Sequence, residues 1–306
     1  MIHNKADVYS MPLMDCDTAC DSNDSEQNVT KPIEIYSFID PLCPECWALE
    51  PIIKKLQTLY GNYLKIVYFI GGKLGKINGS NNQQNQNSKE HMHLAKQWEK
   101  TASRSGMSCD GDLWFENPIS SPFTASLAIK AAEFQGRKAA TRFLRKIREL
   151  LFLDKQNITE KQVLLQCAEM ADLDVAEFEK DLYSERALKA YQCDLKISSE
   201  MGVQEYPSLI FFNENVEEAG IKISGMYSFD VYLDVMSEIL KERPLKQELP
   251  SLEEFLKKYR FVATKEIAVV YDIPDENVEK EMKKLVLKQK VEQVPVKYGT
   301  FWRYKE

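Results

Sequence analysis

The sequence predicts an α/β fold in two parts, a larger mixed domain followed by a smaller, mostly helical one. Three observations lead to this. Apolar residues alternate at period two over 33–39 and over 64–70, the spacing of half-buried strands. Helical spacing lies between these strands and dominates a long block that ends near residue 201. Residues 243–250 then contain two prolines and no periodic pattern, which indicates a domain boundary.

Composition limits the class of protein. The chain has 306 residues, of which 44% are hydrophobic and 28% charged, so it can bury a sizeable core. No apolar run reaches the roughly 18 residues that a membrane span needs. The polar residues 1–31, expected to form a disordered tail, contain no apolar stretch of signal-peptide type. We therefore expect a cytoplasmic protein without membrane contact. A net charge of −7 argues against general affinity for nucleic acid.

The larger domain, expected over 32–243, can be followed element by element. The predicted elements are a strand over 33–39, a helix from Cys46 to Gly61 with a kink at Pro51, a strand over 64–70, a helical insertion over about 88–201, strands over 206–212 and 221–226, and a helix over 229–240. The Asn/Gln-rich run at 78–88 is expected to be an exposed loop, because it has nothing to bury.

The run Cys43-Pro44-Glu45-Cys46 occupies the turn between the first strand and the first helix. At a helix N-terminus, the dipole and the free amides stabilise the thiolate of the first cysteine of such a pair. In a βα unit of a cytosolic chain this is a thioredoxin-type signal. Pro207 opens a later strand, where a thioredoxin fold places a proline beside the dithiol. The sequence therefore predicts a thioredoxin-like domain with Cys43 and Cys46 as redox-active candidates.

The dithiol leaves two interpretations open. It can be the catalytic pair of an oxidoreductase, or it can belong to a fold retained for binding, in which the cysteines catalyse nothing. Glu45 bears on this choice, because a carboxylate beside Cys43 should disfavour the thiolate and argues against a strong oxidant. No catalytic residue is therefore established by the sequence.

A zinc site is the alternative role for the cysteine pair. Two thiolates are half of a tetrahedral set, and either Cys16 and Cys20 or His91 and His93 would have to complete it. Both pairs lie in segments predicted to be mobile, so we predict no metal and no cofactor.

The remaining cysteines carry no clear chemical signal. In a cytosolic protein the seven cysteines should not form a structural disulfide framework. Cys167 and Cys193 lie within helical patterns and are expected to be small core residues, whereas Cys109 lies in a loop and its role cannot be read.

Longer strings allow a narrower comparison. They lie at residues 39–51, 102–111, 130–139 and 260–268. These strings resemble the SpxH (YjbH) family of ClpXP adaptor proteins, and the order of elements resembles the DsbA-type branch of the thioredoxin fold. The resemblance implies an adaptor that is not an enzyme, binds the transcription regulator Spx and promotes its degradation by the ClpXP protease. The Asn/Gln-rich insertion at 78–87 and the cysteines of the tail depart from the family pattern.

The C-terminal residues 250–306 are predicted to form a winged-helix-like domain. The expected elements are helices over 252–259, 264–271 and 277–289, followed by two strands around Gly299. Lys280, Lys284 and Lys288 line one face of the third helix, which raises DNA binding as a hypothesis. Acidic residues interleave with these lysines, so we expect a protein-docking domain and a solvated lysine face instead.

The expected partner-binding surface is the rim of the dithiol. It comprises Trp47 and Tyr206, with Pro44 and Glu45 between the cysteines, and part of the winged-helix-like domain, because exposed aromatics beside a groove favour protein contacts. The alternative is that Trp47 packs inward as a core residue. Three functions compete at this point, namely a proteolytic adaptor, a dithiol oxidoreductase and a DNA-binding redox regulator.

Overall fold

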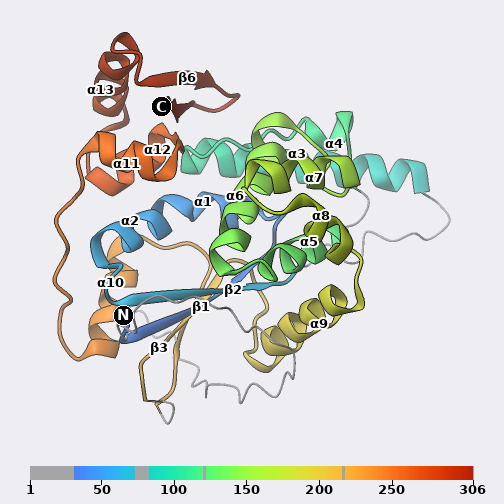
Figure 1. Cartoon of the computed structure of the whole chain (residues 1–306), viewed down its shortest axis with the longest axis horizontal. Helices are drawn as coiled ribbons and strands as arrows, with labels where there is room; N and C mark the ends of the chain where they lie inside the picture. Colours follow the sequence, from blue (N-terminus) through green and yellow to red (C-terminus); the bar gives the residue numbers. More distant parts are fainter. Residues whose placement is uncertain (1–30, 73–82, 120–121, 216–217, 306) are drawn as a thin grey trace.

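A computed structural model describes residues 31–72, 83–119, 122–215 and 218–305 (Figure 1). The thioredoxin-like part and its insertion contain, in chain order, β1 (Ile33–Ile39), α1 (Pro44–Ala48), α2 (Glu50–Tyr60), β2 (Leu64–Ile70), α3 (Gln83–Ser105), α4 (Leu113–Glu116), α5 (Phe123–Glu133), α6 (Arg137–Asp154), α7 (Lys161–Met170), α8 (Val175–Asp181), α9 (Glu185–Glu200), β3 (Ser208–Phe212), β4 (Ile221–Ser224) and α10 (Phe229–Leu240). Within these ranges every helix is too short or too polar to cross a membrane.

The larger sheet has the strand order β2-β1-β3-β4. β1 and β2 are parallel, whereas β3 pairs antiparallel with β1 and β4 antiparallel with β3. Because side chains alternate along a strand, Ile33 and Ile35 of β1 point to the face that α2 and α10 cover. Tyr36 and Phe38 point to the opposite face, where they pack with Ile197 of α9. Both faces of the sheet are thus buried.

The predicted strands at 33–39 and 64–70 and the helix at 229–240 are confirmed. The helix predicted from Cys46 to Gly61 is divided at Leu49 into α1 and α2, and Pro51 lies in the first turn of α2. A proline fits there because first-turn amides need no helical partner.

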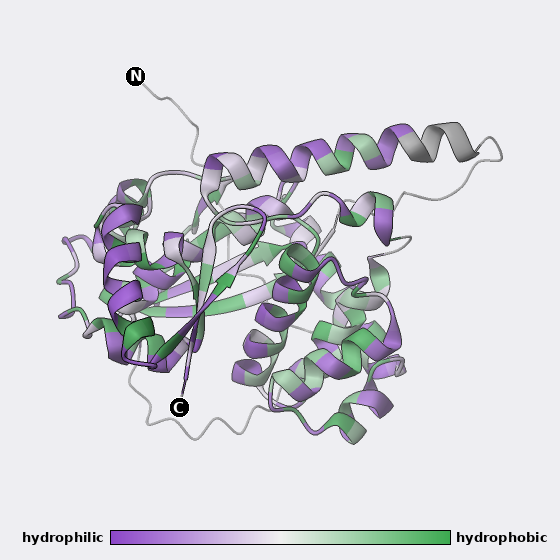
Figure 2. Ribbon diagram, turned by 90° about the horizontal axis from the view of Figure 1, so that it is seen from above, coloured by the Kyte–Doolittle hydropathy of each residue, from purple (hydrophilic) through white to green (hydrophobic). Residues whose placement is uncertain are grey.

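The expectation of a loop at 78–88 is wrong from residue 83 onward. α3 begins at Gln83, and glutamine is a good helix former, so a run rich in glutamine can be part of a helix. Residues 78–82 lie outside the described ranges. Figure 2 shows α3 as a long, largely hydrophilic helix along one edge of the molecule.

The C-terminal unit comprises α11 (Leu252–Tyr259), β5 (Phe261–Ala263), α12 (Thr264–Tyr271), α13 (Asp275–Leu287), β6 (Val291–Pro295) and β7 (Thr300–Tyr304). Its sheet has the order β5-β7-β6, and its core contains Phe255, Ile267, Met282 and Trp302. The helices predicted at 252–259 and 264–271 are confirmed. β5 was not predicted, because three residues show no readable period. The winged-helix-like character of this unit stays a prediction. Figure 1 places α11 and α12 next to α1 and α2.

Candidate functional site

Cys43 caps the N-terminus of α1. Its Sγ accepts a hydrogen bond from the amide of Cys46 at 3.4 Å, and its thiol donates to the carbonyl of Tyr206 at 3.6 Å. The Tyr206–Pro207 peptide bond is cis. Cys43 is half-buried, whereas Cys46 is only 3% exposed. The fold therefore brings both cysteines and the segment of Pro207 together, and it presents the first cysteine to the outside.

The thiol of Cys46 is held in its neutral form. Burial raises its pKa well above the ordinary value, and the neighbouring Cys43 raises it further, while the charge of Arg148 offsets part of the effect. Cys43 and Cys46 are free thiols. Cys43 is thus the sulfur that an external group would meet first.

The other cysteines separate into two kinds. Cys109 and Cys167 are free and fully buried, and burial raises the pKa of both thiols. Cys167 is therefore the core residue that the sequence predicts. Cys193 differs from the expectation, because it is half-buried and disulfide-bonded.

Glu45 is not an isolated charge beside Cys43. Its carboxylate accepts a hydrogen bond from Thr101 Oγ1 at 2.7 Å and forms an ion pair with Arg104. Both partners come from α3, which the sequence does not place next to the dithiol. Arg104 therefore compensates the negative charge of Glu45 beside the dithiol.

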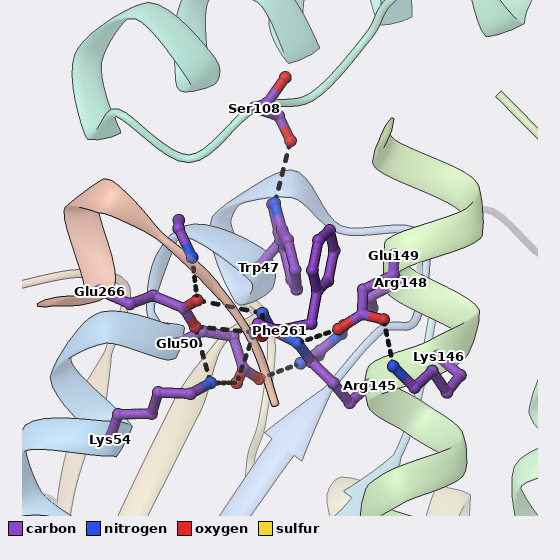
Figure 3. Close-up of polar contacts among 11 residues, drawn as sticks. Trp47, Glu50, Lys54, Ser108, Arg145, Lys146, Arg148, Glu149, Phe261 and Glu266 are labelled. Atoms are coloured by element: carbon purple, nitrogen blue, oxygen red, sulfur yellow. Dashed lines mark hydrogen bonds and ion pairs between the residues drawn. The ribbon is translucent and has the colours of Figure 1, made fainter. Parts of the chain in front are cut away.

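Trp47 is fully buried, so the expectation that it forms part of a docking surface is wrong. Its indole nitrogen donates to the carbonyl of Ser108 at 3.0 Å. Its ring stacks on Phe152 of the insertion, with centroids 5.7 Å apart, and on Phe301 of the C-terminal unit, 6.2 Å away. The guanidinium of Arg145 lies 4.5 Å from the ring centroid. Figure 3 shows the indole with its nitrogen directed at Ser108 and with Arg145 of α6 beside it. Trp47 therefore packs inward and joins three parts of the fold.

The predicted rim is consequently smaller than expected. Pro44 is buried, and only Glu45 and Tyr206 are half-buried. The Tyr206 hydroxyl lies so close to Gly71 that a β-carbon there would collide with it. Burial and the nearby Asp40 carboxylate raise the pKa of Tyr206 to about 12, so its hydroxyl stays protonated. The partly exposed side chains beside Cys43 are therefore those of Tyr206 and of Glu45, which is paired with Arg104.

A buried ion network connects the dithiol helix region to the C-terminal unit. Glu266 of α12 is fully buried, and its carboxylate meets Lys54 Nζ at 2.6 Å and Arg145 Nη1 at 2.7 Å. Burial alone would raise the pKa of Glu266, but the charges of Arg145 and Lys54 lower it to about 2. Figure 3 shows how α2, α6 and α12 contribute one member each. Sequence reasoning missed this network, because its charged residues look like ordinary surface positions.

A second connection lies at the turn between β6 and β7. Lys297 Nζ lies 2.8 Å from Glu99, 2.9 Å from Asp110 and 2.8 Å from Asp112. The next amide, that of Tyr298, donates to Ser108 Oγ at 3.2 Å. The C-terminal hairpin is therefore attached to the same segment that receives the Trp47 indole.

These carboxylates also bear on the zinc alternative. In the part of the chain that the structure describes, Glu99, Asp110 and Asp112 are the only group close enough to hold a metal ion, and Lys297 already lies among them. The structure does not bring His91 or His93 into a ligand set with Cys43 and Cys46. The completion by Cys16 and Cys20 falls outside the described ranges.

Comparison with known proteins assigns the family. The sequence profile of the Thioredoxin family matches residues 36–234. The ClpXP adapter protein SpxH of Halalkalibacterium halodurans is 51% identical over 298 residues, which cover 95% of this chain and 95% of that protein. The ClpXP adapter protein SpxH of Bacillus subtilis is 52% identical over 275 residues, 89% of each chain. The chain belongs to the SpxH family.

Solved structures support the fold of this SpxH-family chain. A putative protein disulfide isomerase from Nitrosomonas europaea superposes with a TM-score of 0.59 at 14% identity, over 69% of this chain and 98% of that one. The cytosolic disulfide reductase DsbM from Pseudomonas aeruginosa gives 0.51 at 16% identity, over 68% and 97%. The thioredoxin-like, DsbA-type fold with a helical insertion is thereby confirmed.

Of the three lysines that raised the DNA hypothesis, Lys284 has an ion-pair partner on its own helix in this SpxH-family chain, and so has the neighbouring Lys283. Lys284 pairs with Glu281 at 2.7 Å, and Lys283 pairs with Glu279 at 3.6 Å, all on the same helix. Such pairs are typical of a solvated helix face. They weaken the case for this helix as a DNA-recognition element.

Proposed function

We propose that this protein is a cytoplasmic adaptor that binds the transcription regulator Spx and promotes its degradation by the ClpXP protease. The observation that carries the proposal is the identity with proteins named ClpXP adapter protein SpxH over 95% of the chain. That identity extends beyond the thioredoxin match, which ends at residue 234, into the C-terminal unit. The relatives named as adapters therefore share the C-terminal unit as well as the thioredoxin-like part.

The geometry supports a binding role in a specific way. Trp47, one turn after Cys43, is fixed between the insertion and the C-terminal unit, so the dithiol rim is rigid. A rigid rim can hold a client in one conformation, and an adaptor promotes degradation by binding more tightly to the conformation that exposes the degradation signal. We place the client contact at the half-buried Cys43, Glu45 and Tyr206.

The proposal includes the division into a thioredoxin-like domain over 32–243 and a winged-helix-like domain over 250–306. The second domain contributes protein contacts, not DNA contacts. Its attachment through Glu266 and Lys297 supports a single continuous binding unit.

A reconstituted degradation assay tests the proposal. Purified Spx is incubated with ClpXP and ATP, with and without this protein, and its half-life is followed on gels. We expect a shorter half-life with the protein present and binding of Spx in a pull-down. No binding and no acceleration would refute the adaptor role. A Cys43→Ala/Cys46→Ala variant shows whether the dithiol is needed, because loss of binding in that variant alone would indicate a redox-gated adaptor.

A dithiol-disulfide oxidoreductase is the second candidate. Cys43 at the N-cap of α1, with a buried Cys46 behind it, is the arrangement in which a nucleophilic and a resolving thiol operate. Insulin-disulfide reduction tests this function. Activity that disappears in Cys43→Ala, with unchanged Spx degradation, would show that the two functions are separate.

A further inference from the structure

A cleft opens where α2, α6 and the C-terminal unit meet. Its volume is about 370 Å³, which lies in the range of ligand pockets, and such sites favour the boundaries between domains. It is lined by residues of α2 (Glu50, Ile53, Lys54, Gln57), of β2 (Tyr68), of α6 (Thr141, Arg142, Leu144, Arg145, Lys146, Glu149), of the end of α7 and the turn after it (Met170, Asp172) and of the end of α11 with the residue that follows (Lys258, Tyr259, Arg260). Neither cysteine of the dithiol belongs to it.

The charge of this cleft is opposite to that of the chain. Its lining carries twice as many lysine and arginine side chains as carboxylates, although the whole protein has a net charge of −7. Deep in the cleft the cations are matched, since Lys54 and Arg145 bind Glu266 and Lys146 binds Glu149. The excess positive charge therefore lies toward the opening (the inner network is drawn in Figure 3).

Two cations at the opening are available to a ligand. Arg142 and Lys258 are exposed, and across the described ranges no carboxylate lies within ion-pair distance of either. Arg142 uses its Nε to bind the carbonyl of Ala171 at 2.9 Å, which orients the guanidinium. The Lys258 ammonium lies 5.2 Å from the centre of the Tyr259 ring. The two cations come from different walls, α6 and α11.

The cleft also offers apolar contacts. Ile53 and Leu144 are buried in its lining, the ring of Tyr259 is half-buried, and Met170 is 42% exposed at the edge. A ligand that carries carboxylates and aliphatic groups on one backbone would use both kinds of contact, with the carboxylates on the outer cations.

We propose that this cleft binds an acidic peptide segment of a partner protein, with its carboxylates on Arg142 and Lys258 and an aliphatic side chain against Ile53 and Leu144. A peptide fits better than a small dicarboxylate, because the cations stand on separate walls, α6 and α11, and the lining also offers the apolar side chains of Ile53, Leu144 and Met170. The proposal goes beyond the adaptor function and does not depend on Spx or ClpXP.

Fluorescence anisotropy with a labelled peptide of alternating glutamate and leucine tests the site. We expect saturable binding that weakens with added salt. A control peptide of the same length, in which lysine replaces every glutamate, should show no comparable binding. The variant Arg142→Glu/Lys258→Glu should bind at least about tenfold more weakly. The matched control is Lys280→Glu/Lys288→Glu, which makes the same charge change at exposed positions in α13 and directly after it and should bind like the wild type.

Three results would overturn the proposal. The first is that the wild type does not bind the peptide, and the second is that both double variants lose peptide affinity equally. The third is that succinate displaces the peptide at concentrations comparable to those of unlabelled peptide, which would indicate a small-dicarboxylate site. Circular dichroism of both variants shows whether they are folded. The peptide assay contains neither Spx nor protease, so a negative result would not bear on the adaptor proposal. A negative result in the degradation assay would likewise not bear on peptide binding in the cleft.

Discussion

The ring of Trp47 lies parallel to that of Phe301, with an angle of 2° between the planes and 6.2 Å between the centroids. Trp47 belongs to the short helix that carries the dithiol, and Phe301 belongs to the last strand of the chain. The contact ties the start of the thioredoxin-like part to the end of the C-terminal unit. Any change in the position of α1 therefore acts directly on the C-terminal unit.

Trp47→Ala should lower the free energy of unfolding by ~3–5 kcal/mol, because a fully buried indole leaves a cavity between the stacked rings and loses its hydrogen bond to Ser108. Denaturant unfolding measures the change. Phe115→Ala serves as the control, since that ring is 58% exposed and its loss should cost little. Equal losses in the two variants would contradict the central packing role of Trp47.

Glu266→Gln should destabilise the protein by ~3–5 kcal/mol near neutral pH, because Arg145 and Lys54 would lose their buried counter-charge. The folded-state pKa of Glu266 is about 2, below its ordinary value of 4.5. Between these values the unfolded state binds the proton and the folded state does not. The contribution of Glu266 is therefore complete above about pH 4.5 and is lost as the pH falls toward 2.

The difference in stability between wild type and Glu266→Gln isolates this group from all others that titrate. It should shrink as the pH is lowered through that window. Glu276→Gln, at an exposed position of α13, should show a small difference at every pH. The measurement should extend from neutral pH to about 2.5, which is roughly half a unit above the folded-state pKa of Glu266. If the stability difference between wild type and Glu266→Gln stayed constant over this range, the pKa of Glu266 would not be depressed.

Lys297→Ala should loosen the hairpin of β6 and β7, because one ammonium holds Glu99, Asp110 and Asp112 together. Removing it leaves these carboxylates to repel one another. We expect faster hydrogen exchange over 291–304 and little change in the sheet of the thioredoxin-like part. Lys288→Ala provides a control at an exposed lysine directly after α13. Unchanged exchange over the hairpin would mean that the remaining contacts are sufficient.

Native alkylation should distinguish the thiols. Iodoacetamide should label Cys43 in the folded protein, whereas Cys46, Cys109 and Cys167 should be labelled only after unfolding, because all three are buried and burial raises the pKa of each. Peptide mass spectrometry after a timed reaction measures the order. Labelling of Cys46 as fast as Cys43 would disprove the assignment of Cys43 as the outer thiol.

Much of the fold could be predicted because its information is local. Period-two alternation over 33–39 and 64–70 and the position of Cys43 at a strand-to-helix turn suffice to predict a thioredoxin-like domain. The same local signals were weak at β5 and misleading at Gln83, where a polar run continues as a helix. Periodicity reads the alternation of apolar and polar residues, so it gives no signal in a run made only of polar residues such as 81–88.

The candidate site was less predictable. Cys43, Cys46 and Pro207 could be found because a short motif and a chain-order rule place them together. Arg104 and Thr101, which bind Glu45, carry no such signal, since they belong to a helix far along the chain.

The α/β class, the dithiol turn and the family resemblance follow from the amino-acid sequence, because they depend on residue types at fixed short spacings. The inward packing of Trp47 and the attachment of the C-terminal unit through Glu266 and Lys297 became visible in the folded chain alone. The physical reason is that burial and ion pairing depend on which segments meet in space. Arg145 and Glu266 are 121 residues apart in the chain and 2.7 Å apart in the fold.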